Sequence, residues 1–545
     1  MTDALTAINT RKTDQRTKAR ADQVQNNAGG FVFSVSNDTR LRRFLILGTT
    51  GGTYYQGEAE LTRENADVVI DAATNNTKAL VDLVVEISLA GRAPKQNPSI
   101  FALAAAAGLG DAEGRKYALD SLSKVARTGT HLFLFATYVE QFRGWGRGLR
   151  NAVGSWYNDK PVDKLAYQAV KYRQRNGWSH RDLLRLSHPV TNDVARKNLY
   201  GWITKGTTEN VPGLVEGFLA AQSATSVDAW ANLVLQHKLS WEMLPDAALK
   251  EAAVWEALLE NGLPQTALMR QLPRLTNLGL LKGATLKKVT AQLSNQDALT
   301  KSRVHPMNVL TAQYTYAGGH SLKGSTTWTP VTKIVDALDA AFYASFGNVE
   351  AANKRTMNAL DVSGSMGSWG WGALHNAGVL TPRNVSAAMS LVTVATEPDV
   401  LTVGFTGGGY SWGGYGRRKA VSSEPLTVLN ISARQRLDDV VKTISGLPFG
   451  STDCALPMVY AKEKSLEIDT FVVWTDNETW AGNIQPFQAL KQYRAASGID
   501  AKLIVCGVTA TDFSIADPSD AGMLDVVGFD SAVPNLIADF SAGRI

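Results

Sequence analysis

The strongest constraint on the fold is a change of sequence pattern near residue 354. From about residue 39 to residue 346, apolar residues recur at helical spacing, and Gly, Pro, Asn and Asp interrupt the pattern at short intervals. Beyond the change, short apolar runs typical of strands alternate with helical segments. A chain of 545 residues is also too long for a single core. The sequence therefore predicts two domains of different fold class, residues 29–353 and residues 354–545.

The first of these domains contains many short helical segments. Residues 247–260 are typical, because an apolar stripe follows one helical face and Asp246 stands where an N-cap belongs. No exact repeat is present, which indicates an irregular all-α stack of helical repeats. Such a stack curves and presents a long concave surface. That surface suits an extended partner better than a small substrate.

The second domain has the pattern of a doubly wound α/β fold. Strands are expected at residues 357–362, 400–405, 470–475 and 502–508, and helices at residues 382–396, 435–444 and 485–496. Thr381 and Pro382 form a typical helix start, with a capping hydroxyl followed by a proline. Alternating strands and helices predict a parallel sheet with helices on both faces. About 190 residues are enough for one such domain.

Charge is distributed unevenly between the two domains. Residues 356–545 hold 13 Lys and Arg against 19 Asp and Glu, whereas residues 1–355 hold 42 against 31. The basic character of the helical part favours either a polyanionic partner such as nucleic acid or a solvated basic surface. Residues 1–28 are polar and lack periodicity, so we expect them to form a flexible arm.

Cysteine usage and hydropathy indicate a reducing, aqueous compartment. Cys454 and Cys506 belong to no CxxC pair and cannot form a disulfide framework. The basic residues near the start of the chain are followed by no apolar core, so no signal peptide is expected. The most apolar stretch, around residues 101–109, is far shorter than the roughly 20 residues of a membrane span. These features predict a cytoplasmic protein without a membrane contact.

A candidate cation site follows the first predicted strand of the second domain. In a doubly wound sheet the carboxyl ends of the strands meet at one crevice, where several oxygen donors would come together. Hydroxyl and carboxylate oxygens suit a hard divalent cation, of which Mg2+ is the favoured one. The residues of the cation site are Asp361, Ser363, Ser365, Thr452 and Asp476.

These five residues resemble the metal-ion-dependent adhesion site of von Willebrand factor A domains. In that family the hydroxyls contact the metal, the aspartates act through water or hydrogen bonds, and a partner carboxylate takes the open position. Two alternatives remain. The site could keep its geometry without binding an ion, or Asp453 could replace Asp476. Because Asp453 would point toward the next helix as a cap, we favour Asp476.

Residues 171–188 form a basic strip with interspersed aromatic side chains. Five Lys and Arg residues face the single acid Asp182, and Tyr172 and Trp178 could stack on unpaired bases. Asn176-Gly177 breaks the helix, and the turn could offer backbone N–H groups to phosphate. The alternative is that the leucines form core and the basic side chains are merely solvated. The candidate RNA-binding residues are Lys171, Arg173, Arg175, His180, Arg181 and His188, with Arg147 from a nearby basic segment.

Several unusual strings in the chain resemble the Ro autoantigen family. They are residues 37–44 (NDTRLRRF), 51–55 (GGTYY), 144–148 (GWGRG), 156–158 (WYN), 303–306 (RVHP), 337–343 (ALDAAFY), 450–458 and 475–480. The resemblance extends over about residues 27–545. It implies that residues 29–353 are a TROVE domain, a ring of HEAT-like helical repeats, which a von Willebrand factor A domain closes within a monomer.

The resemblance also implies an RNA-binding protein rather than an enzyme. In this family small noncoding Y RNAs bind the basic outer surface, and single-stranded 3′ ends of misfolded RNA enter a central hole for quality control or degradation. Bacterial members work with the exoribonuclease polynucleotide phosphorylase. Lys171, Arg175 and His188 match family positions on the Y-RNA surface. Local charge adds Arg173, His180 and Arg181, and helical spacing with Arg143 and Arg150 adds Arg147.

Two other functions compete with RNA binding. One is a metal-dependent protein–protein adaptor that acts mainly through the cation site. The other is a metal-dependent nuclease, which would need clustered carboxylates and a nearby base; the cation site is rich in hydroxyls, and His375 has no evident partner. The Gly- and Trp-rich segments 367–378 and 407–416 fit the family pattern poorly. As loops they would shape partner choice or cover part of the metal, unless they are disordered.

Overall fold

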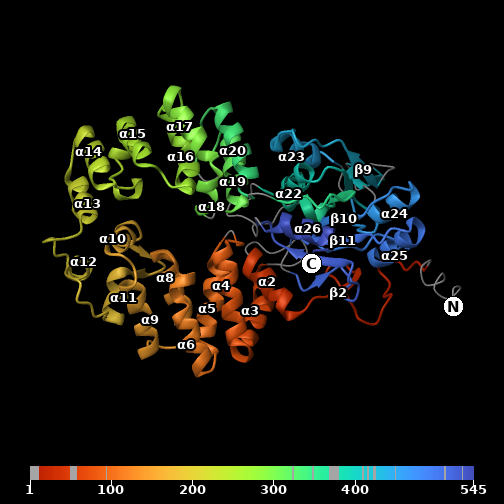
Figure 1. The fold of residues 1–545 in the computed structure, drawn as a ribbon, viewed down its shortest axis with the longest axis horizontal. Coiled ribbons are helices and arrows are strands. Elements are labelled where there is room, and N and C mark those ends of the chain that lie inside the picture. The colour runs from red at the N-terminus through yellow and green to blue at the C-terminus, as the bar shows by residue number, and fades with distance from the viewer. Residues whose placement is uncertain are drawn as a thin grey trace.

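The computed structural model has the two fold classes that the change of pattern predicts. It describes residues 11–48, 58–93, 95–302, 304–321, 324–346, 349–367, 380–407, 410–413, 417–420, 425–447, 450–508, 511–530 and 532–544. A helical domain comes first and an α/β domain follows (Figure 1). The helices of the first domain follow one another around a curve, and both ends of that curve lie beside the α/β domain.

The helical domain consists of short helices joined by turns. They are α2 (Asn37–Leu47), α3 (Glu58–Asn75), α4 (Thr77–Ala90), α5 (Asn97–Leu109), α6 (Ala112–Asp120), α7 (Leu122–Val125), α8 (Gly129–Val139), α9 (Arg147–Asn158), α10 (Val162–Lys171), α11 (His180–Ser187), α12 (Val194–Lys205), α13 (Gly213–Ser223), α14 (Val227–His237), α15 (Ala252–Asn261), α16 (Gln265–Asn277), α17 (Gly283–Leu293), α18 (Gln296–Lys301), α19 (Pro306–Ala317) and α20 (Thr332–Ala344). Two short 3₁₀ helices, η1 (Trp241–Met243) and η2 (Ala248–Lys250), lie between α14 and α15. Among the described helices, none is long and apolar enough to span a membrane.

Local signals in the sequence begin and end many of these helices. Ser36, Asp111 and Asp193 accept hydrogen bonds from backbone N–H groups in the first turns of α2, α6 and α12. Gly91 and Gly206 end α4 and α12 in the left-handed conformation. Many neighbouring helices pack on one another, such as α4 on α5, α14 on α15 and α19 on α20, and a single apolar core continues through the domain.

A small hairpin interrupts the helical domain where the sequence predicted a turn between two helices. β3 (Gln174–Arg175) pairs antiparallel with β4 (Trp178–Ser179), so Arg175 lies opposite Trp178. Asn176 and Gly177 connect the strands with φ angles of 52° and 79°. Asn-Gly favours this left-handed turn because it matches the twist of the two strands. The break in the helix was therefore predicted, but the hairpin was not.

A six-stranded sheet forms the centre of the α/β domain. Its strand order is β13-β11-β10-β5-β6-β9, and all neighbours are parallel except β6 and β9. The strands are β5 (Thr356–Asp361), β6 (Val400–Phe405), β9 (Leu426–Leu429), β10 (Thr470–Thr475), β11 (Lys502–Gly507) and β13 (Met523–Val527). The sequence predicted a parallel sheet, which the other five strands form. It missed the antiparallel edge strand β9, because a run of four residues is too short a pattern to recognise.

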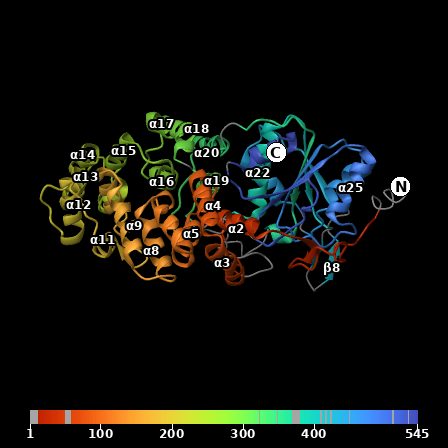
Figure 2. The ribbon, with the colours of Figure 1, turned by 60° about the horizontal axis from the view of Figure 1, so that its bottom comes forward.

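Helices cover both faces of this sheet, as the alternation of elements predicted. One face carries α22 (Pro382–Thr396), α23 (Leu437–Ser445) and α26 (Val533–Ala542), and the other carries α24 (Leu456–Glu463) and α25 (Pro486–Ser497). Figure 2 shows α22 and α25 on opposite sides of the strands. Along β10, Val472 and Trp474 pack toward the first group, whereas Phe471 and Val473 pack toward the second. The core on the α22 side is continuous with that of the helical domain.

Residues 11–34, which we call the N-terminal segment, lie against the α/β domain. β1 (Gln23–Gln25), β2 (Phe31–Ser34) and β12 (Phe513–Ser514) form a three-stranded antiparallel sheet. The ring of Phe33 packs edge-on against Phe487 of α25, with centroids 5.5 Å apart. The sequence predicted a flexible arm for residues 1–28. The described residues 11–28 contradict this, because their side chains and backbone find partners on the α/β domain.

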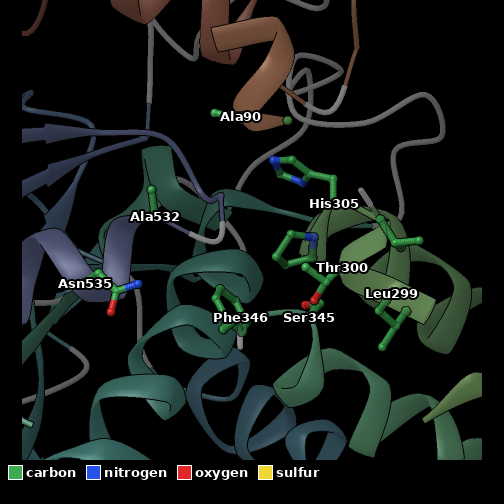
Figure 3. Close-up of a pocket in the computed structure, with 11 residues that line it drawn as sticks. Ala90, Leu299, Thr300, His305, Ser345, Phe346, Ala532 and Asn535 are labelled. Carbon is green, nitrogen blue, oxygen red and sulfur yellow. The ribbon is translucent and has the colours of Figure 1, made fainter. Parts of the chain in front are cut away.

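The two ends of the helical domain also meet each other. His305, the N-cap of α19, bonds to the backbone carbonyl of Arg92, just after α4, at 3.1 Å. Arg92 in turn donates to Asp530 of the α/β domain at 3.2 Å. A cavity of about 340 Å³ lies at this junction, and Figure 3 shows Ala90, His305 and Ala532 around it. These contacts close the curve of helices into a ring.

Candidate functional sites: a cation site and a basic strip

The first three residues of the cation site form a tight turn at the carboxyl end of β5. Oδ1 of Asp361 accepts a hydrogen bond from the N–H of Ser363 at 2.9 Å, and the hydroxyls of Ser363 and Ser365 lie 3.1 Å apart. Oδ2 of Asp361 accepts a hydrogen bond from the hydroxyl of Thr475, the last residue of β10, at 2.8 Å. Asp361 and both serines are buried. The turn therefore holds one carboxylate and two hydroxyls in a fixed arrangement.

The other two residues come from loops that adjoin this turn. The N–H of Gly364 donates to the carbonyl of Gly450 at 3.2 Å, which joins the loop that carries Thr452 to the turn. Asp476 directly follows β10, and its Oδ1 accepts a hydrogen bond from the N–H of Glu478 at 3.1 Å. The structure thus places the turn and Asp476 at the carboxyl ends of the neighbouring strands β5 and β10, as the crevice rule requires, and holds the loop of Thr452 against the turn.

The electrostatics of the cation site suit a bound cation. Burial and the charge of Asp361 raise the pKa of Asp476 to about 7. Burial also raises the pKa of Asp361. A nearby cation would stabilise both carboxylates in their charged form. Two carboxylates with three hydroxyls match the oxygen ligands that Mg2+ prefers, so the residues present fit a divalent cation.

Residues around the cation site bear on the choice between Asp453 and Asp476, which the sequence left open. Oδ1 of Asp453 accepts hydrogen bonds from the N–H of Ala455 at 3.0 Å and from Nε2 of Gln15 at 2.7 Å. Asp453 is thus engaged near the start of α24 and is the weaker candidate for the last acid. Buried Arg383 donates to the carbonyls of Val362 and Ser363 at 2.5 and 2.9 Å. Neither Gln15 nor Arg383 was predicted, because no local motif marks them.

Other metal sites find no support in the part of the chain that the structure describes. No group of three or more His, Cys, Asp and Glu side chains there lies close enough to hold a metal ion. Cys454 and Cys506 are buried and form no disulfide. His375 and most of the segment 367–378 lie outside the described residues. In the segment 407–416, residues 410–413 form β7 (Tyr410–Gly413), which pairs with β8 (Arg417–Ala420).

The basic strip is exposed over the hairpin and along α11. Arg173, Arg175, Arg181 and His188 are all exposed. The guanidinium of Arg173 lies over the ring of Phe218, 5.4 Å from its centroid. His188 ends α11 in the left-handed conformation. Four of the seven candidate RNA-binding residues therefore lie together on one solvent-facing stretch of the chain.

The single acid of the basic strip does not neutralise these cations. Asp182 belongs to a capping box with Ser179 at the start of α11. Its Oδ2 accepts hydrogen bonds from the N–H and the hydroxyl of Ser179 at 2.9 and 2.6 Å. Because this carboxylate is already engaged, the basic side chains of the strip keep their charge available for an anionic partner.

Lys171 is less available than the exposed arginines. Its ammonium group pairs with Glu242 at 3.0 Å and donates to the hydroxyl of Tyr167 at 3.1 Å, and its side chain is only 14% exposed. Burial alone would lower the pKa of Lys171, but the hydrogen bond to Tyr167 and the charge of Glu242 outweigh it and raise the pKa. Lys171 thus ties the end of α10 to Glu242, and only a small part of its side chain is exposed at the surface.

His180 does not belong to the exposed strip, which corrects its assignment as an RNA-binding residue. It is 2% exposed. Its Nδ1 bonds to the hydroxyl of Tyr157 at 2.8 Å, and its ring centroid lies 4.7 Å from that of Phe133. The neighbouring Arg181 points to solvent, because successive residues of a helix face directions about 100° apart. His180 is a core residue of the helical domain.

Arg147 and an aromatic pair extend the basic strip toward α9. Arg147 is exposed at the first position of α9. The rings of Trp145 and Trp178 lie 5.7 Å apart and are tilted by 50°, and both are half-buried. Trp178 is the hairpin residue opposite Arg175. Arginine and indole groups therefore alternate on this surface, which is the arrangement that binds phosphates together with unpaired bases.

Comparisons with known proteins identify the family of both domains. A family model described as TROVE domain matches residues 24–212 and 225–354, and one described as Ro60 vWA domain matches residues 355–541. The chain belongs to the Ro family. A Deinococcus radiodurans relative, named RNA-binding protein RO60, is 41% identical over 554 residues, and the alignment covers 100% of this chain and 100% of the relative. A Caenorhabditis elegans relative of the same name is 37% identical, over 97% of this chain and 92% of its own.

A solved structure of the Ro family supports the fold. The crystal structure of the Deinococcus radiodurans RO (RSR) protein matches with a TM-score of 0.70 at 40% identity, over 94% of this chain and 100% of that chain. The family models meet at residues 354 and 355, beside the predicted domain boundary. The basic strip lies within the TROVE match and the cation site within the Ro60 vWA match. Of the strings that carried the resemblance to the Ro family, residues 51–55 lie outside the described residues.

Proposed function

We propose that this Ro-family protein binds RNA through the basic strip on the outside of its helical ring. The observation that carries the proposal is the exposure of Arg173, Arg175, Arg181 and His188 beside an acid that is already engaged. Unpaired cations supply phosphate contacts, and the half-buried Trp145 and Trp178 supply faces for unpaired bases. The relatives named RNA-binding protein RO60 support the same assignment.

The RNA that we propose for this surface is a small noncoding RNA of the Y type. In the same proposal, a single-stranded 3′ end of misfolded RNA enters the centre of the ring, and a 3′–5′ exoribonuclease such as polynucleotide phosphorylase receives it. The protein itself would act as a cytoplasmic monomer without catalytic activity, in RNA quality control or degradation. Support comes from membership of the Ro family and from a ring that its own contacts close.

RNA binding by the purified full-length chain tests this proposal. A structured RNA with a single-stranded 3′ tail is compared with its blunt duplex over a salt series. We expect tighter binding of the tailed RNA and a steep loss of affinity with salt, because phosphate contacts release counterions. No binding even at low salt would refute the proposal and favour the protein–protein adaptor.

Charge-reversal variants distinguish RNA binding through the basic strip from a general effect of the net charge of the protein. We expect Arg175→Glu and Arg181→Glu to weaken RNA binding at least about tenfold, since each removes and reverses a phosphate contact. Lys288→Glu on α17 makes the same change of charge at an exposed position away from the strip (Figure 1). Equal losses in all three variants would mean that net charge, not the strip, determines affinity.

For the cation site we propose Mg2+ as the ligand. Asp361, Ser363, Ser365, Thr452 and Asp476 would hold it, and a bound Mg2+ would supply an open position for a carboxylate of a partner. Added Mg2+ should raise the melting temperature of the wild type and not that of Asp361→Ala, while RNA affinity stays the same in both. RNA cleavage by the pure protein with Mg2+, lost in Asp361→Ala, would contradict a non-catalytic role.

A further inference from the structure

Gln15 of the N-terminal segment joins the two loops that carry Thr452 and Asp476. Its side chain is completely buried. Its Nε2 donates to Oδ1 of Asp453 at 2.7 Å and to the carbonyl of Ile484 at 2.9 Å. Its Oε1 accepts a hydrogen bond from the hydroxyl of Thr479. Asp453 follows Thr452 directly, and Thr479 lies three residues after Asp476, so one amide group fixes both loops at once.

Residues 26–30 of the same segment form hydrogen bonds to the second of these loops, the one that begins with Asp476. Nδ2 of Asn26 donates to the carbonyls of Asn477 and Thr479 at 3.2 and 2.9 Å. Nδ2 of Asn27 and the N–H of Ala28 donate to the two carboxylate oxygens of Glu478, each at 3.0 Å. Every residue from 477 to 479 is thus bonded to the N-terminal segment.

Two glycines show how closely these parts approach. A Cβ atom on Gly30 would lie 1.8 Å from the carbonyl oxygen of Thr479. A Cβ atom on Gly482 would lie 2.3 Å both from Oδ1 of Asp453 and from Nε2 of Gln15. The backbone atom beside Gly30 cannot move aside as a flexible side chain can, and the two atoms beside Gly482 are hydrogen-bonded to each other. Glycine at both positions therefore permits this close fit of the segment and the two loops.

This fit matters for a cation because Mg2+ accepts little variation in ligand geometry. The turn with Asp361, Ser363 and Ser365 is fixed by β5, whereas Thr452 and Asp476 stand on loops. The N–H groups that bond Glu478 and the amide of Gln15 restrict outward movement of the loop that follows Asp476.

We propose that the N-terminal segment is a positioning element of the cation site, with Gln15 as its central positioning residue. The segment touches no ligand position itself. It holds the loops of Thr452 and Asp476 at the separation that a hard divalent cation requires. The inference rests on the proposed cation site and adds a dependence on a part of the chain more than four hundred residues away in sequence.

Mg2+ binding to the full-length chain, measured by calorimetry at a temperature where every variant is folded, tests this role. We expect Gln15→Ala and Gly482→Ala to weaken Mg2+ binding by about tenfold, the lower end of the usual cost of losing a group that orients the ligands of a metal. Gln25→Ala is the matched control, since Gln25 is an exposed glutamine of the same segment whose Nε2 donates to Gly29. Its affinity should equal that of the wild type.

A second measurement needs no variant. If the docked segment strengthens cation binding, bound cation must strengthen docking of the segment by the same factor. Mg2+ should therefore slow hydrogen exchange at the amides of Gln15 and Phe31, which bond to Gly482 and Gln15. It should also slow exchange at Ala28. Exchange in α17 of the helical domain serves as the internal reference and should not change.

The outcomes distinguish the two proposals. If the wild type binds Mg2+ and both variants bind it equally well, the positioning role is wrong and the cation site stands. If Mg2+ binds but leaves the exchange of the N-terminal segment unchanged, the positioning role is also wrong. If the wild type binds no Mg2+, the proposed cation site fails and the positioning role fails with it.

Discussion

Nε2 of His305 donates a hydrogen bond to the backbone carbonyl of Arg92, a residue 213 positions earlier in the chain. Nδ1 of the same ring accepts a hydrogen bond from the N–H of Met307 at 3.1 Å. The two bonds require a neutral imidazole with its proton on Nε2. Burial lowers the pKa of His305, which favours that neutral form. The closure of the helical ring therefore depends on a fully engaged, buried histidine.

His305→Ala should weaken this closure. The substitution leaves the carbonyl of Arg92 without its donor and opens a space beside an existing cavity. We expect a loss of about 1–3 kcal/mol in the free energy of unfolding, the usual cost of an unsatisfied buried polar group. Thermal denaturation checks the prediction. The exposed His320 bonds within its own turn, so His320→Ala should change the melting temperature very little.

Of the residues that join α2 to the α/β domain, Arg43 should be the one whose loss costs the most stability. It is completely buried, and it donates to the carboxylate of Asp525 at 2.7 Å and to the carbonyl of Phe513 at 2.8 Å. Arg43→Met would leave that carboxylate without its partner, at a cost of about 3–5 kcal/mol. Its neighbour Arg42 is partly exposed and pairs with the exposed Asp38, so Arg42→Met should cost less than about 1 kcal/mol. Chemical denaturation of both variants compares them.

The parts of the fold that the sequence predicted are those with local signals. Thr381 and Pro382 begin α22 as expected, because a capping hydroxyl and a proline act within one turn. Asp246 fails as a predicted N-cap, since a 3₁₀ turn precedes α15 and the helix begins at Ala252. The buried Met243 and Ala248 fix that turn, so tertiary packing overrides the local signal. The three-stranded sheet of the N-terminal segment was missed because its strands have only two to four residues.

The candidate sites also contain some residues that local patterns predicted and others that they did not. The neighbouring positions of Asp361 and Asp476 could be predicted, because strand ends of a parallel sheet converge on one edge. Gln15 could not, because it stands 438 residues from Asp453 in a stretch without a motif. His180 was assigned to RNA from the charge of its neighbours. The charges of neighbouring residues do not show which way a side chain points, and at its position in α11 the side chain of His180 points into the core.

The contribution of two buried histidines to stability should fall between pH 6.5 and pH 4. Burial lowers the pKa of both His131 and His180 to about 4, below the usual 6.5. In this window each of these histidines binds a proton in the unfolded chain but not in the folded chain, so its contribution to the free energy of unfolding decreases as pH falls. Each histidine should contribute about 2 kcal/mol of that decrease between pH 7 and pH 5. His180→Gln should remove its share, and equal pH dependence in wild type and variant would contradict the prediction.

Lys171 and Arg175 should differ in what their loss does to the protein, although both belong to the basic strip. Lys171 is paired with the half-buried Glu242, whereas Arg175 is exposed on the hairpin. Arg175→Met should weaken RNA binding and leave the melting temperature unchanged. Lys171→Met should weaken RNA binding and also cost about 1–3 kcal/mol of stability, because Glu242 keeps a desolvated charge without a partner.

A double variant separates the two effects of Lys171. Adding Glu242→Leu to Lys171→Met removes the unpaired carboxylate, so stability should return while RNA affinity stays low. Calorimetric unfolding and RNA titration on the same preparations measure both quantities. If RNA affinity also returns in the double variant, Lys171 acts by supporting the surface and not by contacting phosphate. In that case the exposed Arg173, Arg175, Arg181 and His188 would carry the phosphate contacts of the strip alone.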